Sequence, residues 1–284
     1  MIISIASGKG GTGKTTVATN LAVSADEPVQ LLDCDVEAPN AHLFLNPTIE
    51  KTQTVTTPVP RIDLEACDQC KKCMQICRFR AITVIGEMVL TFPELCHSCG
   101  GCMAICPQGA ISETERELGE LQTGRRNGVG FIHGRMRVGE AMAPPLIRAV
   151  RKEARSQGLI LIDAPPGTSC PVIAAMKDTD FVLLVTEPTP FGLHDLALAV
   201  EAVKILDIPM GLVVNRCDMG DDAVRRYARR ENLPVLMEIP FDRQIARSYS
   251  RGELFAQAIP EWKDRFRELL QRIKKQTGKE AAAR

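Results

Sequence analysis

Short apolar runs alternate with amphipathic stretches over most of the chain. The apolar runs predict buried strands at about 1–6, 29–35, 158–167, 181–188, 210–216 and 234–240. Helical patterns occupy about 15–24, 140–156, 194–206, 221–232 and 260–275. Apolar strands that alternate with helices indicate βαβ units, which build a parallel sheet with helices on both faces. We therefore expect an α/β host fold with a mostly parallel, doubly wound sheet.

This alternation is interrupted in the first half of the chain. Residues 46–60 are rich in Thr and Pro and are expected to form a linker. A cysteine-rich block follows at about 61–112, and a polar, glycine-containing stretch occupies 113–139. We expect one discontinuous domain, 1–60 and 113–284, interrupted by a small inserted domain at 61–112.

The composition excludes several classes of function. The chain has 284 residues, and its 35 Lys and Arg balance 35 Asp and Glu, so no binding to nucleic acid is expected. Nine Phe, two Tyr and one Trp are too few for a base-stacking platform. There is no run of 18 apolar residues and no signal-peptide pattern. A cytoplasmic location is therefore expected.

A glycine-rich loop follows the first expected strand. Residues 8–15, GKGGTGKT, satisfy the pattern G-x-x-x-x-G-K-[ST] and open a helix, which is the context that a P-loop requires. Glycines let backbone N–H groups face phosphate oxygens, and the helix N-terminus adds positive potential. Lys14 is expected to reach the β- and γ-phosphates, and Thr15 to ligate Mg²⁺. The predicted nucleotide-binding residues of this segment are Gly8, Lys9, Gly10, Gly11, Thr12, Gly13, Lys14, Thr15 and Thr16.

The sequence KGGTGKT resembles the deviant P-loop of the MinD/ParA/Mrp ATPases, a class distantly similar to the nitrogenase iron protein. The resemblance implies an ATP-bound homodimer in which Lys9 acts on the partner's phosphates. It also implies that Asp35 manages the attacking water, a role suited to a carboxylate. Asp163 would hold Mg²⁺ through water, and the Gly167 N–H would sense the γ-phosphate. By the same resemblance the base site is lined by Asn215, Pro240 and Asp242.

The tetrapeptide Asn215-Arg216-Cys217-Asp218 leaves the choice of base open, because it also resembles the box with which GTPases select guanine. An Asp at its end would pair with the N1–H and N2–H of guanine. The overall class favours ATP, and GTP stays as the alternative.

Eight of the 11 cysteines lie within the block, in two runs of C-x2-C-x2-C-x3-C, the second followed by Pro107. This is the ligand pattern of bacterial two-cluster ferredoxins, in which the fourth cysteine of each run ligates the other cluster. The block therefore resembles a small α+β ferredoxin domain with two [4Fe–4S] clusters. Zinc is the alternative, but zinc sites use paired knuckles with longer gaps. The expected ligands are Cys67, Cys70, Cys73 and Cys106 for cluster A, and Cys96, Cys99, Cys102 and Cys77 for cluster B.

Basic residues accompany the first run, where Arg78 replaces the usual proline after Cys77. Cations near a cluster raise its reduction potential. They would also dock an acidic redox partner, although charges exposed merely to solvent are an equal alternative. The residues concerned are Lys71, Lys72, Arg78 and Arg80.

Three cysteines lie outside the block. Cys34 and Cys217 are expected in the core. Cys170 lies seven residues after Asp163, the offset of a cluster ligand in the nitrogenase iron protein. It is a candidate interface thiol, and a structural role is the alternative. The C-terminal segment 262–279 is basic and amphipathic, and we expect it to pack against the core rather than a membrane.

These features predict a partner-stimulated P-loop ATPase that couples a nucleotide-dependent dimer to electron transfer through two [4Fe–4S] clusters. Its cofactors would be ATP, Mg²⁺ and the two clusters, and its redox partner is not identified by the sequence. The first alternative is an iron–sulfur cluster carrier of the Mrp type. The second is a MinD-like positioning ATPase whose clusters sense redox state.

Overall fold

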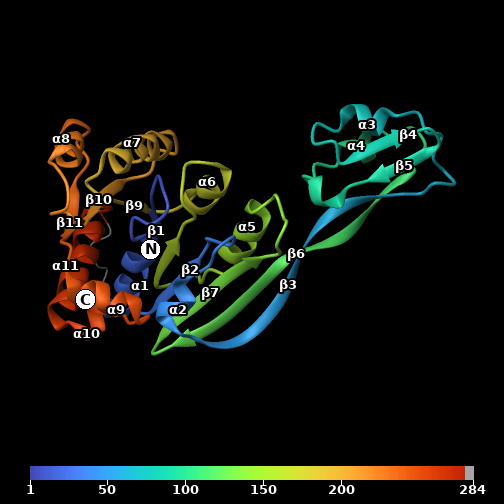
Figure 1. Ribbon diagram of the computed structural model, residues 1–284. Helices are drawn as coiled ribbons and strands as arrows, with labels where there is room; N and C mark the ends of the chain where they lie inside the picture. The colour runs from blue at the N-terminus through green and yellow to red at the C-terminus, as the bar shows by residue number, and fades with distance from the viewer. Residues whose placement is uncertain (279–284) are drawn as a thin grey trace.

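The computed structural model describes residues 1–278 and consists of an α/β body and a small lobe (Figure 1). The described residues of the body form a nine-stranded sheet in the order β11-β10-β9-β1-β8-β2-β7-β6-β3. The strands from β11 to β7 are parallel, and β6 and β3 continue the sheet in antiparallel pairing. Their bounds are β1 (Ile2–Ala6), β2 (Val29–Asp33), β3 (Thr48–Ile62), β6 (Ile111–Arg126), β7 (Val129–Met136), β8 (Leu159–Asp163), β9 (Phe181–Thr186), β10 (Met210–Asn215) and β11 (Val235–Ile239).

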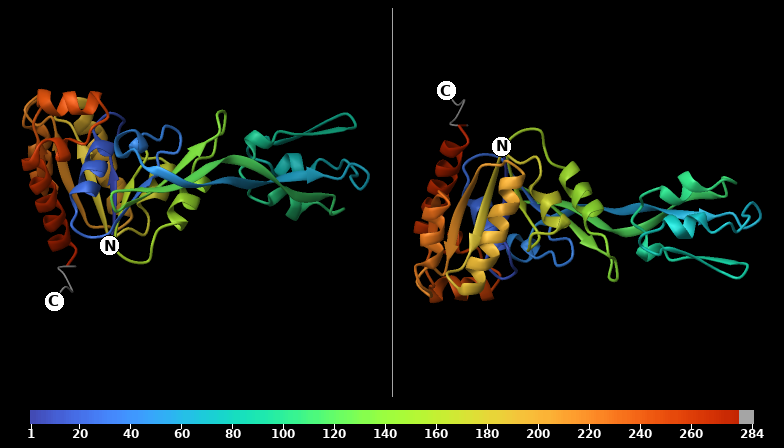
Figure 2. Two further views of the ribbon diagram at one scale, coloured as in Figure 1. Left: turned by 90° about the horizontal axis from the view of Figure 1, so that it is seen from below. Right: turned by 90° about the horizontal axis from the view of Figure 1, so that it is seen from above.

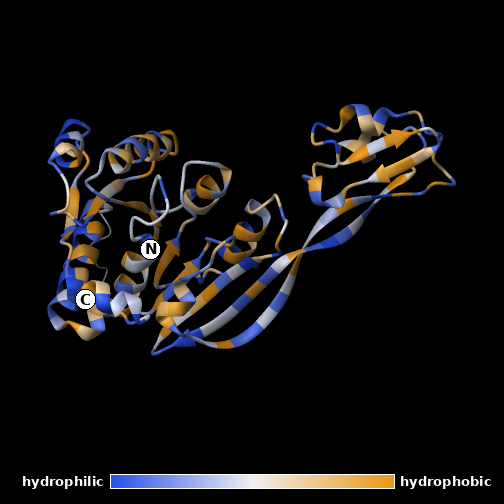
Figure 3. Ribbon diagram, in the orientation of Figure 1, coloured by the Kyte–Doolittle hydropathy of each residue, from blue (hydrophilic) through white to orange (hydrophobic). Residues whose placement is uncertain are grey.

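Helices cover both faces of the sheet, as the alternation of strands and helices predicts. In β8, Leu159 and Leu161 pack into one core with α1 and α11, whereas Ile160 and Ile162 pack into the other with α5 to α8. This period of two is expected of a strand buried on both faces. Apolar colour is accordingly concentrated in the central strands (Figure 3). The helices are α1 (Lys14–Ser24), α2 (Ala41–Leu45), α5 (Pro144–Lys152), α6 (Cys170–Met176), α7 (Pro190–Ile205), α8 (Ala223–Arg230), α9 (Arg243–Ser250), α10 (Phe255–Ala258) and α11 (Pro260–Gln276).

Helix α11 is a core helix. Trp262, Phe266 and Ile273 are at most 2% exposed and pack against the core that β1 and α1 share. Lys279, the last residue of the expected basic segment, lies outside the described residues. Within residues 1–278, no helix combines the length and the apolar character needed to cross a membrane.

One expectation for the interrupted region is wrong. Residues 46–60 are no linker, because β3 spans Thr48–Ile62, and the polar stretch after the block forms β6 and β7. Alternating Thr and Val residues suit a pleated strand. Pro58 and Pro60 are tolerated because β3 is the edge strand, where a missing N–H breaks no ladder.

The lobe comprises residues 63–110 and stands away from the body on two strands (Figures 1 and 2). It contains α3 (Lys72–Ile76), β4 (Ile82–Ile85), β5 (Met88–Thr91), a 3₁₀ turn (Pro93–Leu95) and α4 (Gly101–Ile105). Strand β6 pairs with β7 over Gly119–Arg126. Beyond that point Thr56–Ile62 and Ile111–Glu117 pair with each other and form a ribbon that carries the lobe.

Candidate functional site

The P-loop connects β1 to α1, and close packing explains two of its glycines. A Cβ on Gly8 would lie 2.0 Å from the carbonyl oxygen of Asp195 in α7. Gly13 has φ of 98°, and a Cβ there would lie 2.5 Å from Nδ2 of Asn215. That amide in turn donates a hydrogen bond of 2.9 Å to the carbonyl of Thr12. The loop is therefore held between α7 and the end of β10.

A cavity of about 430 Å³ opens beside this loop, at the carboxyl ends of the parallel strands. Ligands of open α/β sheets bind at this edge, and the volume falls in the range of small-molecule sites. The cavity brings together predicted residues from distant parts of the chain. They are Gly10, Gly11, Gly13, Lys14, Thr15, Thr16, Asp35, Asn215, Pro240 and Asp242.

The proposed magnesium residues are in contact. The Thr15 hydroxyl donates a hydrogen bond of 2.6 Å to Oδ2 of Asp163, whose side chain is fully buried. The other oxygen, Oδ1, has no hydrogen-bond partner among the described residues. Burial raises the pKa of Asp163 to about 6, although Lys14 and the Thr15 hydroxyl oppose the rise. An unsatisfied carboxylate oxygen beside a hydroxyl fits a hydrated Mg²⁺.

A second buried carboxylate shapes the loop that carries Asp35. Asp33 accepts hydrogen bonds from the backbone N–H groups of Asn40 at 3.1 Å and Ala41 at 3.0 Å. Burial raises the pKa of Asp33 well above its usual range, and the negative charge of Asp163 is the next largest cause. Asp35 lines the cavity, and burial raises its pKa while Lys14 opposes the rise. A higher pKa makes Asp35 a better proton acceptor.

Three predicted residues make other contacts here. The Gly167 N–H donates to the carbonyl of Ser7 at 3.0 Å, so its role toward a γ-phosphate stays a prediction. Among the described residues, Lys9 is absent from the cavity lining, and its Nζ lies 3.7 Å from Oε2 of Glu187. Asp218 accepts from the Phe241 N–H at 2.7 Å, and in the described chain it does not line the cavity. The choice between ATP and GTP thus stays a prediction.

Several cavity residues were missed by sequence reasoning. The cavity is also lined by Arg216, which the sequence analysis considered only as part of the tetrapeptide at 215–218. Four further lining residues were not predicted, namely Asn40, Phe241, Tyr249 and Phe255. They come from the loop after β2 and from the segment after β11. No motif marks them, because their position depends on packing of α9 and α10 near α1.

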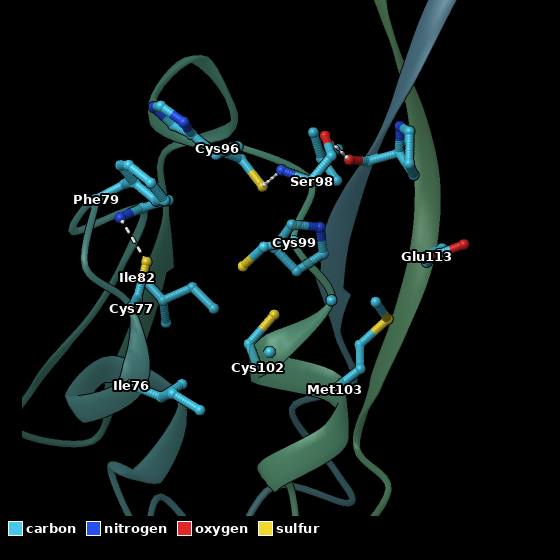
Figure 4. Close-up of a pocket in the computed structure, with 17 residues that line it drawn as sticks. Ile76, Cys77, Phe79, Ile82, Cys96, Ser98, Cys99, Cys102, Met103 and Glu113 are labelled. Carbon is cyan, nitrogen blue, oxygen red and sulfur yellow. Dashed lines mark hydrogen bonds between the residues drawn. The ribbon is translucent and has the colours of Figure 1, made fainter. Parts of the chain in front are cut away.

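The eight cysteines of the lobe divide between two hollows. One is lined by Cys77, Cys96, Cys99 and Cys102, whose sulfur atoms face a common space (Figure 4). The other is lined by Cys67, Cys70, Cys73 and Cys106. Each hollow thus combines three cysteines of one run with the fourth cysteine of the other run.

The donor chemistry of these hollows suits iron–sulfur clusters. The Ala81 N–H donates to Sγ of Cys77 at 3.2 Å, and the Ser98 N–H donates to Sγ of Cys96 at 3.4 Å. Such hydrogen bonds to sulfur are among the features that tune cluster potentials. In residues 1–278, no three Cys, His, Asp or Glu side chains are gathered closely enough to grip one metal ion. The four thiols that line each hollow are donors suited to an iron–sulfur cluster, and the choice between clusters and zinc stays a prediction.

The nucleotide cavity and the sheet that carries it match known proteins. Residues 3–255 match the family model described as the CobQ/CobB/MinD/ParA nucleotide binding domain. The chain belongs to this family. MinD/ParA-type P-loop proteins are nucleotide-binding ATPases, and the described sheet is that of an α/β P-loop NTPase.

Individual members of the MinD/ParA family resemble the chain along most of its length. An uncharacterized protein of Methanocaldococcus jannaschii is 31% identical over 283 residues, 96% of each chain. An iron-sulfur cluster carrier protein of Pyrococcus abyssi is 24% identical over 84% of this chain and 74% of that one. The septum site-determining protein MinD of Pyrococcus horikoshii, solved with Mg-ADP, has a TM-score of 0.62 at 21% identity and covers 99% of both chains.

The remaining cysteines lie outside both hollows. Cys34 is fully buried in the core, as expected, and burial raises its pKa. Cys217 is half-buried against the same core. Cys170 is exposed at the first residue of α6, so its role as an interface thiol stays a prediction.

Proposed function

We propose that this MinD/ParA-family protein is an ATP-dependent homodimer that couples nucleotide binding and hydrolysis to electron transfer through two [4Fe–4S] clusters. The observation that carries the proposal is the partition of the eight lobe cysteines into two hollows of four. When bound, each cluster would accept and pass on a single electron. Residues 61–112 would form the cluster domain, and 1–60 with 113–284 the ATPase domain.

The nucleotide site has residues for each step of ATP hydrolysis. Lys14 would bind the β- and γ-phosphates, while Thr15 and Asp163 would orient hydrated Mg²⁺. Asp35, whose pKa is raised by burial, would hold and deprotonate the attacking water. Lys9 would complete the site of the partner subunit, which makes hydrolysis dependent on the dimer.

A chain of contacts leads from the nucleotide site to the lobe. In the loop that carries Asp35, the carbonyl of Val36 accepts a hydrogen bond of 2.8 Å from the N–H of Met136. The next amide, of Arg137, donates to Leu118 at the base of the ribbon at 3.0 Å. We name residues 136–140 the brace, because they join this loop to the ribbon.

Charged side chains extend the brace towards the second cysteine run. Glu140 forms a bidentate pair with Arg116 of the ribbon, and these side chains are 1% and 11% exposed. Arg137 lies 4.0 Å from Glu94 in the lobe, two residues before Cys96. A nucleotide that moves the Asp35 loop would thus move the ribbon, which is a two-state switch of a familiar kind.

The test is anaerobic purification followed by EPR titration with and without ATP and Mg²⁺. Iron analysis should give about eight irons per chain, four for each cluster. Changing both Cys77 and Cys96 to Ser should halve the iron and leave the cluster A signal. If ATP changes neither the cluster signals, their potentials nor their oxidation rate, coupling is refuted.

We propose that the redox partner of this electron-transfer protein is an acidic protein. Lys71, Lys72, Arg78 and Arg80 are exposed beside the cysteine hollows, and charge complementarity raises association rates at low salt. Changing Lys71 and Lys72 to Glu should slow reduction by an acidic ferredoxin. The matched control changes Lys263 and Lys275, exposed on α11, to Glu. An unchanged, salt-independent rate in the first variant would remove the docking surface.

A second candidate function is delivery of iron–sulfur clusters to other proteins. It is favoured by relatives that are named iron-sulfur cluster carrier proteins, such as that of Pyrococcus abyssi at 24% identity. The two functions differ in how firmly the clusters are held. Transfer of labelled iron to an apo-acceptor, with the cysteine runs left empty, would favour delivery over electron transfer.

A further inference from the structure

We propose that Glu187 is a positioning residue that retains Lys9 within its own subunit and releases it when the ATP-bound dimer forms. The inference deepens the proposed function and rests on it, since it assumes that Lys9 acts on the partner's nucleotide. It assigns a role to a carboxylate that no sequence motif marks.

Glu187 directly follows β9, and its carboxylate forms ion pairs with two cations. Its Oε2 lies 3.7 Å from Nζ of Lys9, and its Oε1 lies 2.7 Å from Nη1 of Arg216. The Glu187 side chain is 10% exposed, whereas those of Lys9 and Arg216 are 30% and 50% exposed. A carboxylate so far removed from water is stabilised by paired cations.

The backbone around Glu187 is fixed, so the carboxylate is a stationary anchor. Its carbonyl oxygen accepts the Thr189 N–H at 2.8 Å. The same oxygen would lie 2.3 Å from a Cβ on Gly192, which shows how closely α7 begins against it. The Lys9 backbone is also held, because its carbonyl accepts the hydroxyl of Ser7 at 2.5 Å. We therefore expect the exchange of partners to involve chiefly the side chain of Lys9.

The two possible partners of Lys9 compete for one charge. Glu187 is an anion that the structure places beside Lys9 within the same subunit. The triphosphate of a neighbouring subunit would offer a larger negative charge in a closed interface, where water is excluded. Lys9 is partly exposed, so the bond to Glu187 is weak enough to break, as is typical of ion pairs at a surface. Glu187 thus sets a threshold for dimer formation.

The role of Arg216 follows from the same carboxylate. Arg216 lines the nucleotide cavity, whereas Glu187 stands between it and the P-loop lysine. Glu187 therefore joins Lys9, outside the cavity lining, to Arg216, which lines the cavity, through two ion pairs. Loss of its charge would free both cations, so a Lys9→Ala background is needed to separate the effect of the Lys9 pair from that of the Arg216 pair.

The experiment measures the ATP concentration that gives half-maximal dimer, by light scattering of the full chain with Mg²⁺. Glu187→Gln keeps the shape and removes the charge, and should lower this concentration about two- to fivefold. Glu187→Asp keeps the charge and should lie nearer to the wild type. Glu201→Gln is the control, because Glu201 is exposed on α7 and pairs with Lys204 instead. Thermal melting of each variant shows that it is folded.

A Lys9→Ala background separates retention from a structural effect. There, Glu187→Gln should no longer shift the ATP dependence of any residual dimer or the ATP affinity of the monomer. The proposal is overturned if Glu187→Gln alone does not change the ATP concentration for half-maximal dimer, or if it changes this concentration equally with and without Lys9→Ala. Either result leaves the ATP-bound dimer itself intact. A wild-type chain that stays monomeric with ATP instead removes the dimer mechanism, and the role of Glu187 with it.

Discussion

Replacing Glu140 by Gln tests whether the brace holds the lobe to the nucleotide-dependent loop. The Glu140 carboxylate accepts hydrogen bonds from Arg116 and also from Arg137, whose Nη2 lies 3.1 Å away. The Glu140 side chain is 1% exposed, so the unmet hydrogen bonds of Arg116 cannot easily be taken over by water. Loss of a hydrogen bond to a charged group costs about 1.5–3 kcal/mol, and we expect about 2 kcal/mol here.

Hydrogen exchange measures this cost where it arises. The amides of Met136 and Arg137 bond to Val36 and Leu118, so they exchange when the brace opens. A loss of about 2 kcal/mol should speed their exchange about 30-fold, since 1.4 kcal/mol is a factor of ten. Amides in the central strand β1 should be unaffected, because the brace does not contact that strand's ladder.

The control is an exposed ion pair that involves β6, the strand that also carries Arg116. Arg125 and Glu50 join β6 to β3 with side chains 68% and 44% exposed. Glu50→Gln should change exchange by less than about 1 kcal/mol, which is typical of surface pairs. If both variants speed exchange of Met136 and Arg137 equally, or neither does, the brace is not the element that joins the loop to the ribbon.

Two further changes test the buried histidine and the glycine loop. Burial is the main cause that lowers the pKa of His133 to about 4, and the charges of His42 and Arg135 lower it further. Between about pH 6.5 and pH 4, this histidine is therefore protonated in the unfolded chain but stays neutral in the folded chain. The contribution of His133 to stability should therefore fall by about 2 kcal/mol from pH 7 to pH 5, and His133→Gln should remove this contribution in thermal melts, whereas His194→Gln, exposed on α7, should keep it. Gly8→Ala should abolish nucleotide binding in calorimetry, because the added Cβ would clash with the backbone carbonyl of Asp195. Gly10→Ala should leave the loop folded, because no atom lies within 4 Å of the added Cβ. Equal nucleotide binding by the two variants would contradict this reasoning.

The parallel part of the fold was predictable because its strands are buried on both faces. Runs such as residues 159–162 are continuously apolar, and this pattern is independent of their neighbours. Strands β3 and β6 could not be recognised in the same way. In the outer part of β3, Thr and Pro alternate with Val, and buried residues (Thr57, Val59, Pro60) are interspersed with exposed ones (Thr56, Pro58, Arg61), so no continuous apolar run marks the strand. The composition of residues 46–60 therefore favoured a linker, whereas pairing with the distant strand β6 makes this segment a strand.

The site was predictable where spacing along the chain sets the chemistry. Lys14 and Thr15 follow from one motif, and their approach to Asp163 follows from adjacent parallel strands. Glu187 and Asn40 could not be found, since each acts through neighbours that only the assembled sheet provides. The same holds for the brace, whose members are close in space but belong to no shared motif.

The length of the ribbon gives the lobe mechanical leverage. A strand rises about 3.3 Å per residue, so Thr56–Ile62 extends roughly 23 Å, and the lobe packs along it through Ser98, which bonds to Thr57 and Pro58. A tilt of about 10° at the base would displace the far end of the ribbon, and the part of the lobe attached there, by about 4 Å, with no hydrogen bond of the ribbon broken. A side-chain adjustment at the nucleotide would thereby become a translation large enough to bring a cysteine hollow up to another protein, or to withdraw it.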